Sequence, residues 1–395
     1  MRIGIVGPFN PLSIASFLYG DDVPFINEGT TAVNTLAKEF LKQGHYLKIF
    51  TLSSIKPNVY QVIKGENVEI HIIPSGLFPS LFGNHMFIIG LYFLSRRISK
   101  VINKELEGLD VLHAHWTYEY AKAASCFSDK IPVFDTVRDW CPYQLSIMKG
   151  RDKIYWSIKY LIFRQVMSDK NITFIANSGY TYRMLKEAYP SKEMPIIPNP
   201  IDKNWILEEK SEQTKHQIIS IATGLLSPRK NIGTLLEAFS LYRKKFKDAT
   251  LHLVGGYDKT DEVYKNWEKR KLTEGVVFYG LLPHNDLAKL LDRMSCLVHP
   301  SLEETFGNIL LEAMSRRVLC IGGADAGAVP DVLGHGKYGL ICDIKNPSAI
   351  FYAMEKVLEP KVSGDLQRNA TEMLKNIYSS EIIAGKHIEL FQRYE

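Results

Sequence analysis

The sequence has few cysteines, and none of them stands in a paired pattern. Its 395 residues contain five, and they are scattered along the chain: Cys126, Cys141, Cys296, Cys320 and Cys342. Zinc sites and the disulfide frameworks of small domains both need short, repeated cysteine spacings. The pattern therefore argues against both, predicts no metal site and favours a reducing compartment.

Long apolar runs are also missing. The longest candidate, Met86–Leu94, has nine residues, whereas a membrane-spanning helix needs about 20. The first residues, Met1–Pro8, resemble a buried strand and a turn, without the basic, apolar and cleavage regions of a signal peptide. We therefore expect a cytoplasmic protein, and peripheral attachment to the inner face of the cell membrane stays open.

A strong overall charge is lacking too, but the small excess is unevenly distributed. Residues 1–200 hold 22 basic and 17 acidic side chains, and residues 201–395 hold 26 of each, so the first half carries the whole net charge of +5. This asymmetry predicts an acidic partner for the first half. Two stretches, 86–104 and 149–164, combine aromatic with basic residues. They fit either an anionic membrane surface or core helices with charged ends. No nucleic-acid motif is found, so nucleic acid is not an expected partner.

The chain is too long for one hydrophobic core, which stops growing at about 250–300 residues. Short apolar runs alternate with amphipathic stretches such as Ala32–Gln43, a pattern typical of parallel sheets wrapped by helices. The expected strands are Arg2–Val6, Tyr46–Leu52, Val68–Ile73, Val111–His113, Val133–Phe134, Phe174–Ala176, Ile218–Ala222, Leu251–Val254, Val276–Phe278, Cys296–His299, Val318–Ile321 and Leu340–Cys342.

The alternation stops at the proline-rich stretch Pro195–Asp202, which is a poor place for a regular element and a good linker. We predict an α/β protein of two doubly wound domains, residues 1–200 and 201–375, with a cleft between them. The C-terminal helix, about 376–395, is a candidate to pack back on the first domain. Ligands of such sheets bind at the carboxyl ends of the strands.

The most informative segment is His299–Arg317, where a strand, a loop and a helix follow one another. We expect the helix to begin near Phe306–Gly307, where its unpaired amides and dipole can bind an anion. Glu304 would then lie just before the helix and Glu312 two turns inside it, roughly 12 Å apart. That distance is about the span from the ribose to the sugar of a nucleotide-sugar. Carboxylates bind sugars well because each accepts hydrogen bonds from several hydroxyl groups. An ordinary helix with a surface glutamate at each end fits the same pattern.

A second segment, Ser220–Phe239, leads from a strand through a glycine-containing loop to the basic pair Arg229 and Lys230. Two cations in such a loop can hold a diphosphate leaving group, although a solvated basic loop is the alternative. His113 and His115 stand two residues apart on a strand, so they point the same way. They are candidates for a metal-binding or acid–base pair and for a substrate contact, and more often such residues line a cleft or fill a core.

Together these segments resemble family 4 of the retaining glycosyltransferases. The resemblance rests on an ordered series of motifs: Gly224 with Lys230-Asn231, Leu253–Gly256, Val277–Gly280, Glu304–Gly307 with Glu312–Met314, and Gly322-Gly323 with Pro330-Asp331. The first half matches more loosely, at Glu28–Thr31, Gly44-His45, Asp110–His115, Ile175–Ser178 and Ile196–Asp202. The resemblance covers roughly residues 1–345 and is most specific from 218 to 331.

The resemblance implies the GT-B fold, with two facing Rossmann-like domains and an interdomain cleft. The first domain would bind the acceptor and the second the donor, without a required metal or another cofactor. It implies a retaining hexosyltransferase that moves a hexosyl group from a nucleoside diphosphate sugar, UDP or GDP, to a hydroxyl. The expected acceptor is a glycan or a lipid-linked glycan, and the expected setting is cell-surface polysaccharide biosynthesis.

The resemblance also implies roles for single residues. Lys230 would bind the donor diphosphate, Glu304 the transferred sugar near its anomeric centre and Glu312 the ribose, with Glu304 and Lys230 essential for catalysis. The remaining donor contacts would come from backbone: the amides of Thr305, Phe306, Gly307 and Asn308 at the sugar and phosphates, those around Phe278 at the base, and the loop at Gly29 at a phosphate.

Two positions depart from the family pattern. Leu225 stands where an arginine is common, so Arg229 is the expected substitute in donor binding. Arg138 precedes Asp139 where many members have a histidine. Because arginine cannot act as a base, Arg138 would instead stabilise charge or bind an acidic acceptor. Two alternatives stay open: a GT-B sugar-nucleotide epimerase, and a non-catalytic nucleotide- or glycan-binding homologue.

Overall fold

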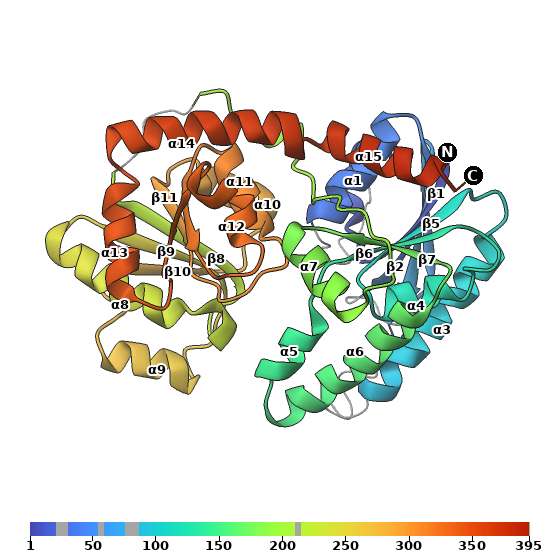
Figure 1. Cartoon of the computed structure of the whole chain (residues 1–395), viewed down its shortest axis with the longest axis horizontal. Coiled ribbons are helices and arrows are strands. Elements are labelled where there is room, and N and C mark those ends of the chain that lie inside the picture. Colours follow the sequence, from blue (N-terminus) through green and yellow to red (C-terminus); the bar gives the residue numbers. More distant parts are fainter. Residues whose placement is uncertain (21–30, 54–58, 76–86, 210–214, 395) are drawn as a thin grey trace. The chain divides into compact units, whose positions relative to one another are not determined.

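The chain divides into two compact units. Unit 1 comprises Met1–Pro200 with Ser380–Glu395, and unit 2 comprises Ile201–Ser379. The structure is a computed structural model that describes residues 1–20, 31–53, 59–75, 87–209 and 215–394 (Figure 1). Each unit is built around its own sheet and core.

Unit 1 contains a seven-stranded sheet in the order β3-β4-β2-β1-β5-β6-β7. Its strands are β1 (Arg2–Val6), β2 (Tyr46–Ser53), β3 (Gln61–Gly65), β4 (Val68–Pro74), β5 (Val111–His115), β6 (Val133–Val137) and β7 (Ile172–Ala176). All neighbours pair in parallel except β3 and β4, which form an antiparallel hairpin. Apolar, β-branched runs suit the parallel strands because helices cover both faces of the sheet.

The helices of unit 1 lie in two layers (Figure 1). They are α1 (Thr31–Lys42), α3 (Phe87–Glu105), α4 (Glu119–Ser125), α5 (Cys141–Ile147), α6 (Gly150–Ser168), α7 (Gly179–Ala188) and α15 (Ser380–Gln392), with the 3-10 helix η1 (Pro11–Phe17). Helices α1 and α15 share one core cluster, which includes Phe40 and Phe391. Helices α3, α4 and α6 contribute to another, which includes Ile98 and Phe163. Helix α15 is also tied to α1 by a 2.8 Å hydrogen bond from Ser380 Oγ to a carboxylate oxygen of Glu39.

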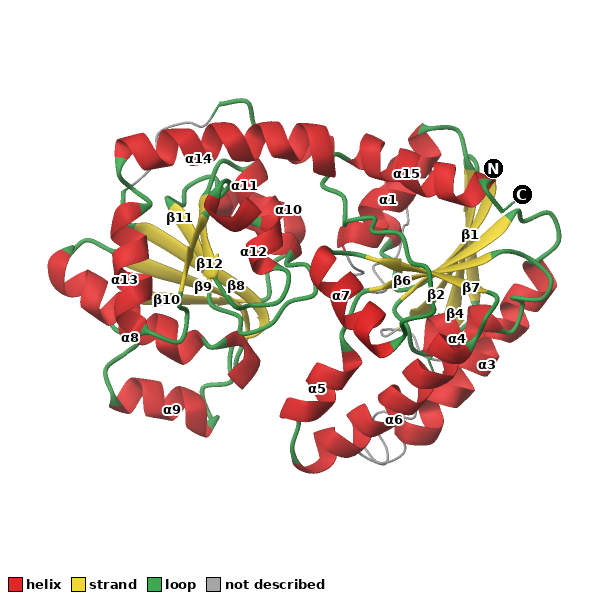
Figure 2. Cartoon of the chain, in the orientation of Figure 1, coloured by secondary structure: helices red, strands yellow, loops and turns green. Residues whose placement is uncertain are grey.

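Unit 2 contains a six-stranded, all-parallel sheet in the order β10-β9-β8-β11-β12-β13 (Figure 2). Its strands are β8 (Gln217–Gly224), β9 (Thr250–Gly256), β10 (Val276–Gly280), β11 (Cys296–His299), β12 (Leu319–Gly323) and β13 (Leu340–Cys342). Its α-helices are α8 (Ile232–Lys245), α9 (Glu262–Lys269), α10 (His284–Leu291), α11 (Asn308–Ser315), α12 (Val329–Val332), α13 (Pro347–Lys356) and α14 (Pro360–Met373). The order of the sheet reverses between β8 and β11, which is where doubly wound sheets bind ligands.

The predicted α/β class with doubly wound sheets is confirmed, and each predicted strand lies at its place, several of them longer than expected. Strand β3 was not expected, because Gln61–Gly65 is short and mostly exposed at the sheet edge. The stretch Pro195–Asp202 contains no regular element, only single bridges at Ile196 and Ile201. Among the described residues, no helix is both long and apolar enough to cross a membrane.

One close approach of backbones shapes the carboxyl edge of the unit 2 sheet. Gly255, near the end of β9, has φ of +146°, and a Cβ there would overlap the carbonyl oxygen of Ala222 on β8. One residue on, the carbonyl of Gly256 accepts a 2.9 Å hydrogen bond from the Leu225 amide. Only glycine permits this approach, which sets where the loop after β8 begins.

We therefore expect Gly255→Ala to destabilise unit 2 by about 2–4 kcal/mol, because it adds both backbone strain and a steric overlap. Thermal unfolding followed by calorimetry measures the effect on the full chain. Gly224→Ala is the matched control, since a Cβ at Gly224 meets nothing within 4 Å and its φ lies outside the positive region. Equal midpoints for the two variants would contradict the assignment.

Candidate active site

The candidate site lies at the carboxyl edge of the unit 2 sheet, where two neighbouring strands lead into loops. Strand β8 continues into the 3-10 helix η4 (Pro228–Lys230), and β11 continues into the loop before α11. Because β8 and β11 pair side by side, their loops meet. A 2.8 Å hydrogen bond from the Leu302 amide to the Arg229 carbonyl joins them.

Glu304 is the centre of this edge, because three basic side chains surround its Oε1. Lys230 Nζ forms an ion pair and hydrogen bond with this oxygen. Arg229 Nη1 lies 3.6 Å from it and His299 Nε2 lies 3.4 Å from it. The side chains of Glu304 and Lys230 are only 15% and 10% exposed, so water screens their attraction weakly.

These neighbours decide the ionisation of Glu304. Burial alone would raise its pKa, but the charge of Lys230, the nearby His299 ring and the charge of Arg229 hold the pKa well below its ordinary range. The carboxylate is therefore ionised at any physiological pH. It is positioned to accept hydrogen bonds from hydroxyl groups.

The backbone of Glu304 is held by a third loop, which follows β12. The Ala328 amide donates a 2.8 Å hydrogen bond to the Glu304 carbonyl, and Glu304 and Gly327 form an isolated parallel bridge. Gly327 has φ of +67°, and a Cβ there would overlap the Glu304 carbonyl oxygen. Three loops thus fix one carboxylate.

Helix α11 begins two residues after Phe306, with Gly307 as its N-cap at φ of +89°. The predicted start near Phe306–Gly307 is therefore one residue early. Glu312 is the fifth residue of α11, little more than one turn from its start, and the expectation of two turns is wrong. Because the first half of the interval from Glu304 lies in the loop, the helical rise of 12 Å does not apply to it.

Glu312 has its own set of contacts. Its Oε1 lies 3.5 Å from His284 Nε2, and its side chain is 8% exposed. The His284 ring stacks on Trp205, with 4.0 Å between ring centroids. His284 thus lies beside the carboxylate to which the family resemblance gives the ribose, and Trp205 packs on that histidine.

The remaining donor contacts predicted in unit 2 lie on the same edge. Phe278, on β10, is half-buried and packs on Tyr257 and Tyr264, with centroid distances of 4.9 Å and 5.3 Å. Arg229 also donates a 2.7 Å hydrogen bond to the Glu303 carbonyl. Leu225 is buried in the core of unit 2. Gly29 lies outside the described residues.

Arg138 lies in unit 1, at the carboxyl end of β6. Its Nη1 donates to Asn199 Oδ1 at 2.6 Å, and Nη2 lies 3.0 Å from His115 Nδ1. Burial lowers its pKa to about 10, against the opposing charges of Asp135 and Asp139. The guanidinium stays charged at neutral pH, and part of it is already engaged in positioning its neighbours.

The paired histidines of β5 fill a core. His113 and His115 are fully buried, with 4.0 Å between ring centroids, and His387 of α15 lies 4.8 Å from His113. His113 Nε2 is 2.8 Å from Thr136 Oγ1. Burial, with the charge of Arg138 added, lowers the pKa of all three histidines, so they are neutral at pH 7.

The sequence assigned no role to three residues that shape the site: His299 beside Glu304, Gly327 behind it and His284 beside Glu312. His299 could have been found, because it ends a strand directly before the loop of Glu304. Gly327 and His284 are brought near by tertiary folding from other loops. Residue spacing carries no signal for that.

Two family matches cover most of the chain. Residues 203–376 match the family described as Glycosyl transferases group 1, and residues 29–205 match Glycosyltransferase Family 4. The chain belongs to glycosyltransferase family 4. It is thus an enzyme of a retaining family that transfers a sugar from a nucleotide-sugar donor.

Relatives and solved structures agree with this membership. The chain is 22% identical to N-acetyl-alpha-D-glucosaminyl L-malate synthase of Bacillus anthracis over 92% of this chain and 93% of that protein. Sucrose-phosphate synthase from Thermosynechococcus elongatus superposes with a TM-score of 0.78 at 16% identity, covering 100% and 98% of the chains. Anabaena HepE in complex with UDP and glucose superposes with a TM-score of 0.68 at 15% identity, covering both chains fully. These likenesses confirm the GT-B class of fold with its two Rossmann-like sheets.

The ion pair at Glu304 makes the stability of this glycosyltransferase depend on pH in a defined way. Because the folded-state pKa of Glu304 lies below its ordinary 4.5, its contribution to stability is complete above about pH 5 and falls as the pH drops through the folded pKa. Lys230→Met should raise that pKa and cost roughly 2 kcal/mol or more at pH 7. The cost should shrink towards pH 4, as Glu304 becomes protonated in the variant.

Chemical unfolding of both proteins at pH 7 and pH 4 measures this difference. Lys244→Met is the matched control, because Lys244 is an exposed residue in the last turn of α8. A cost for Lys230→Met that is the same at both pH values would show that the pair does not control Glu304.

Proposed function

We propose that this enzyme is a retaining hexosyltransferase that uses UDP- or GDP-sugars and acts on a hydroxyl of a glycan or lipid-linked acceptor in cell-surface polysaccharide biosynthesis. The observation that carries the proposal is the group formed by Glu304, Lys230 and Arg229, held by three loops at the start of α11. One carboxylate and two cations lie together there, and this supports the proposal because a sugar diphosphate offers hydroxyl groups to the carboxylate and negative charge to the cations.

The proposed mechanism exchanges the partners of Lys230. In the structure its ammonium pairs with Glu304; with donor bound, the diphosphate takes the ammonium, and Glu304 accepts a hydroxyl of the transferred sugar. The bond from the anomeric carbon to the diphosphate oxygen breaks as the acceptor oxygen bonds to the same face. The acceptor's proton passes to the departing diphosphate, whose growing negative charge Lys230, Arg229 and the amides of Thr305–Asn308 stabilise.

The nucleoside would lie on the other contacts of the same edge. Glu312, flanked by His284, would hold the ribose hydroxyls, and the backbone around Phe278 would contact the base. We propose that no metal is required, because Lys230 and Arg229 supply positive charge of the kind that a divalent cation brings to a diphosphate. The base and the sugar are left to experiment.

The acceptor side of the proposal rests on unit 1. Arg138 is charged and half-buried at the carboxyl end of β6, where it suits an acidic acceptor or the developing charge of the reaction. The similarity to an L-malate-modifying synthase supports an acidic acceptor. L-Malate therefore belongs among the acceptors to be tested.

The first test measures donor binding and transfer. A thermal-shift screen with UDP-, GDP- and ADP-sugars identifies the donor, and release of nucleoside diphosphate is then followed with glycan, lipid-linked and malate acceptors. Lys230→Ala and Glu304→Gln should each lower kcat at least about 100-fold, while circular dichroism shows an intact fold. Lys244→Ala should retain the wild-type rate.

Other outcomes would overturn parts of the proposal. Near-normal turnover in either variant would remove the assigned chemistry. Conversion of the sugar-nucleotide without any acceptor would identify an epimerase. Tight donor binding without nucleoside diphosphate release under any acceptor would identify a binding protein. Loss of transfer in EDTA, restored by a divalent cation, would show that a metal is required.

We further propose that unit 1 contacts an anionic membrane surface through 86–104 and 149–164. These stretches form most of helices α3 and α6. Each helix exposes large apolar side chains, among them Phe93 (51%), Ile154 (48%) and Leu161 (53%). Exposed basic residues accompany them, including Lys153 and Arg164. Apolar groups with basic neighbours are suited to a membrane interface.

Vesicle sedimentation tests this contact. The wild-type chain should bind vesicles of anionic lipid at low salt, and Ile154→Ser with Leu161→Ser should weaken binding about tenfold. Tyr352→Ser, at a 65% exposed residue on α13 of unit 2, should leave binding unchanged. Equal binding to zwitterionic vesicles, or none at low salt, would remove the membrane proposal without affecting the enzymatic one.

A further inference from the structure

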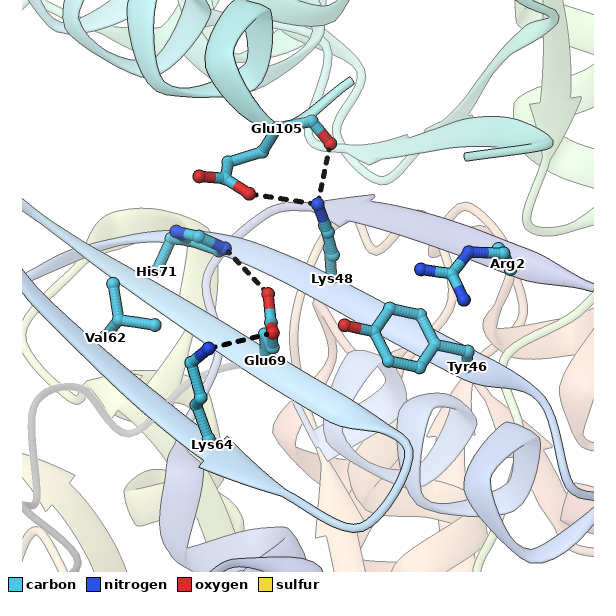
Figure 3. Close-up of a pocket in the computed structure, with 8 residues that line it drawn as sticks. All are labelled: Arg2, Tyr46, Lys48, Val62, Lys64, Glu69, His71 and Glu105. Carbon is cyan, nitrogen blue, oxygen red and sulfur yellow. Dashed lines mark hydrogen bonds and ion pairs between the residues drawn. The ribbon is translucent and has the colours of Figure 1, made fainter. Parts of the chain in front are cut away.

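A pocket of about 390 Å³ lies on unit 1, away from the carboxyl edge of its sheet (Figure 3). Its lining comes from the first residues of β1 and β2, from β3 and β4 and from the end of α3: Arg2, Tyr46, Lys48, Val62, Lys64, Glu69, His71 and Glu105. Strand register explains the grouping. Glu69 pairs with Lys48 on one side and Lys64 on the other, and His71 follows Glu69 by two residues on the same face.

Three of these side chains form a mixed set of donors. The imidazole of His71 and the carboxylates of Glu69 and Glu105 each offer an atom, and these atoms lie within 4.8 Å of one another. Donors around a tetrahedral zinc ion are about 3.3 Å apart, as bond lengths of about 2 Å require. Small side-chain rotations would therefore bring the three into a coordination shell, with a position left for water.

A second observation points to a ligand. His71 is 1% exposed, yet its Nε2 makes no hydrogen bond among the described residues, and Glu69 Oε2 lies 3.9 Å away. Its other nitrogen, Nδ1, lies 2.8 Å from the Tyr60 hydroxyl. Figure 3 shows the ring directed towards the two glutamates. A buried nitrogen without a hydrogen bond is costly, and a partner on the opposite nitrogen is what orients metal-binding histidines.

We propose that Glu69, His71 and Glu105 form a binding site for a divalent transition-metal ion such as Zn²⁺. The imidazole suits it, because the Tyr60 hydroxyl contacts Nδ1 and leaves the buried Nε2 without a hydrogen bond. With the proton on Nδ1 and shared with Tyr60, Nε2 presents a lone pair to the metal. An imidazole with two carboxylates is a donor set that zinc accepts.

The two lysines take part in this equilibrium. Without metal, Lys64 balances Glu69 at 3.3 Å and Lys48 balances Glu105 at 2.9 Å. The Lys64 side chain is 67% exposed, so it can leave for water when a metal arrives. Lys48 keeps a second partner, because it also donates to the Glu105 carbonyl at 3.0 Å.

The site would join the β3–β4 hairpin to the end of α3 and so secure the open edge of the sheet. It lies in the amino-terminal half of the strands, whereas the reaction is expected at their carboxyl ends. Its role is therefore structural, and it is independent of the sugar-transfer chemistry.

Calorimetric titration of the metal-free full chain with Zn²⁺ tests the proposal, and thermal unfolding gives a second readout. We expect one equivalent to bind and to raise the unfolding midpoint. His71→Gln and Glu69→Gln should each weaken binding at least tenfold. Lys64→Ala should strengthen binding severalfold, because it removes the competing cation.

The matched control is His335→Gln in unit 2, where an exposed histidine lies 3.3 Å from Asp331. Binding that is lost in this control and kept in His71→Gln would place the metal elsewhere and overturn the proposal. Weaker Zn²⁺ binding in Lys64→Ala would contradict competition between the ammonium and the metal and so remove the site. A midpoint raised by inorganic phosphate and not by Zn²⁺ would identify an anion pocket. Absence of any Zn²⁺ binding by the wild-type chain would equally remove the site.

Discussion

The organisation of unit 2 depends on keeping one carboxylate ionised in a partly buried place. Glu304 loses most of its water and gains Lys230, Arg229 and His299 in exchange. An unpaired charge there would be strongly unfavourable. The loops after β8, β11 and β12 must therefore adopt the conformations that bring these basic side chains to Glu304. The same electrostatic balance suits the proposed binding of a diphosphate, since an incoming anion would meet cations whose present partner can be exchanged.

Close backbone contacts make that arrangement rigid. Gly255 lets β9 approach β8, and Gly327 lets the loop after β12 approach Glu304. Both positions exclude a side chain for steric reasons, and both act on backbone atoms. The cations are therefore positioned by main-chain geometry as much as by their own side-chain contacts, which is the preorganisation that charge stabilisation in a reaction requires.

Hydrophobic runs and residue spacing predicted those features of the structure that depend on neighbouring residues in the sequence. Apolar runs marked the parallel strands, and the interval between Glu304 and Glu312 marked the candidate site. The edge strand β3 was not predicted, because its residues are largely exposed and show little periodicity in hydrophobicity. The contacts of His284 with Glu312 and of Gly327 with Glu304 were not predicted, because only tertiary folding brings these residues together. The depth of Glu312 in α11 was misjudged because Gly307 delays the start of the helix by its left-handed conformation.

The structure also changes how the basic excess of the first 200 residues is understood. Several of those cations are used inside unit 1: Lys48 on Glu105, Arg138 on Asn199, and Lys159, which is buried with its ammonium 4.2 Å from the Tyr118 ring centre. Such buried cations cannot attract a distant partner as exposed ones do, because neighbouring groups in unit 1 already compensate most of their charge. The proposed contacts with an acidic acceptor or a membrane would therefore depend for attraction on exposed basic residues of α3 and α6, such as Lys100 and Arg164, and net charge alone overstates that attraction.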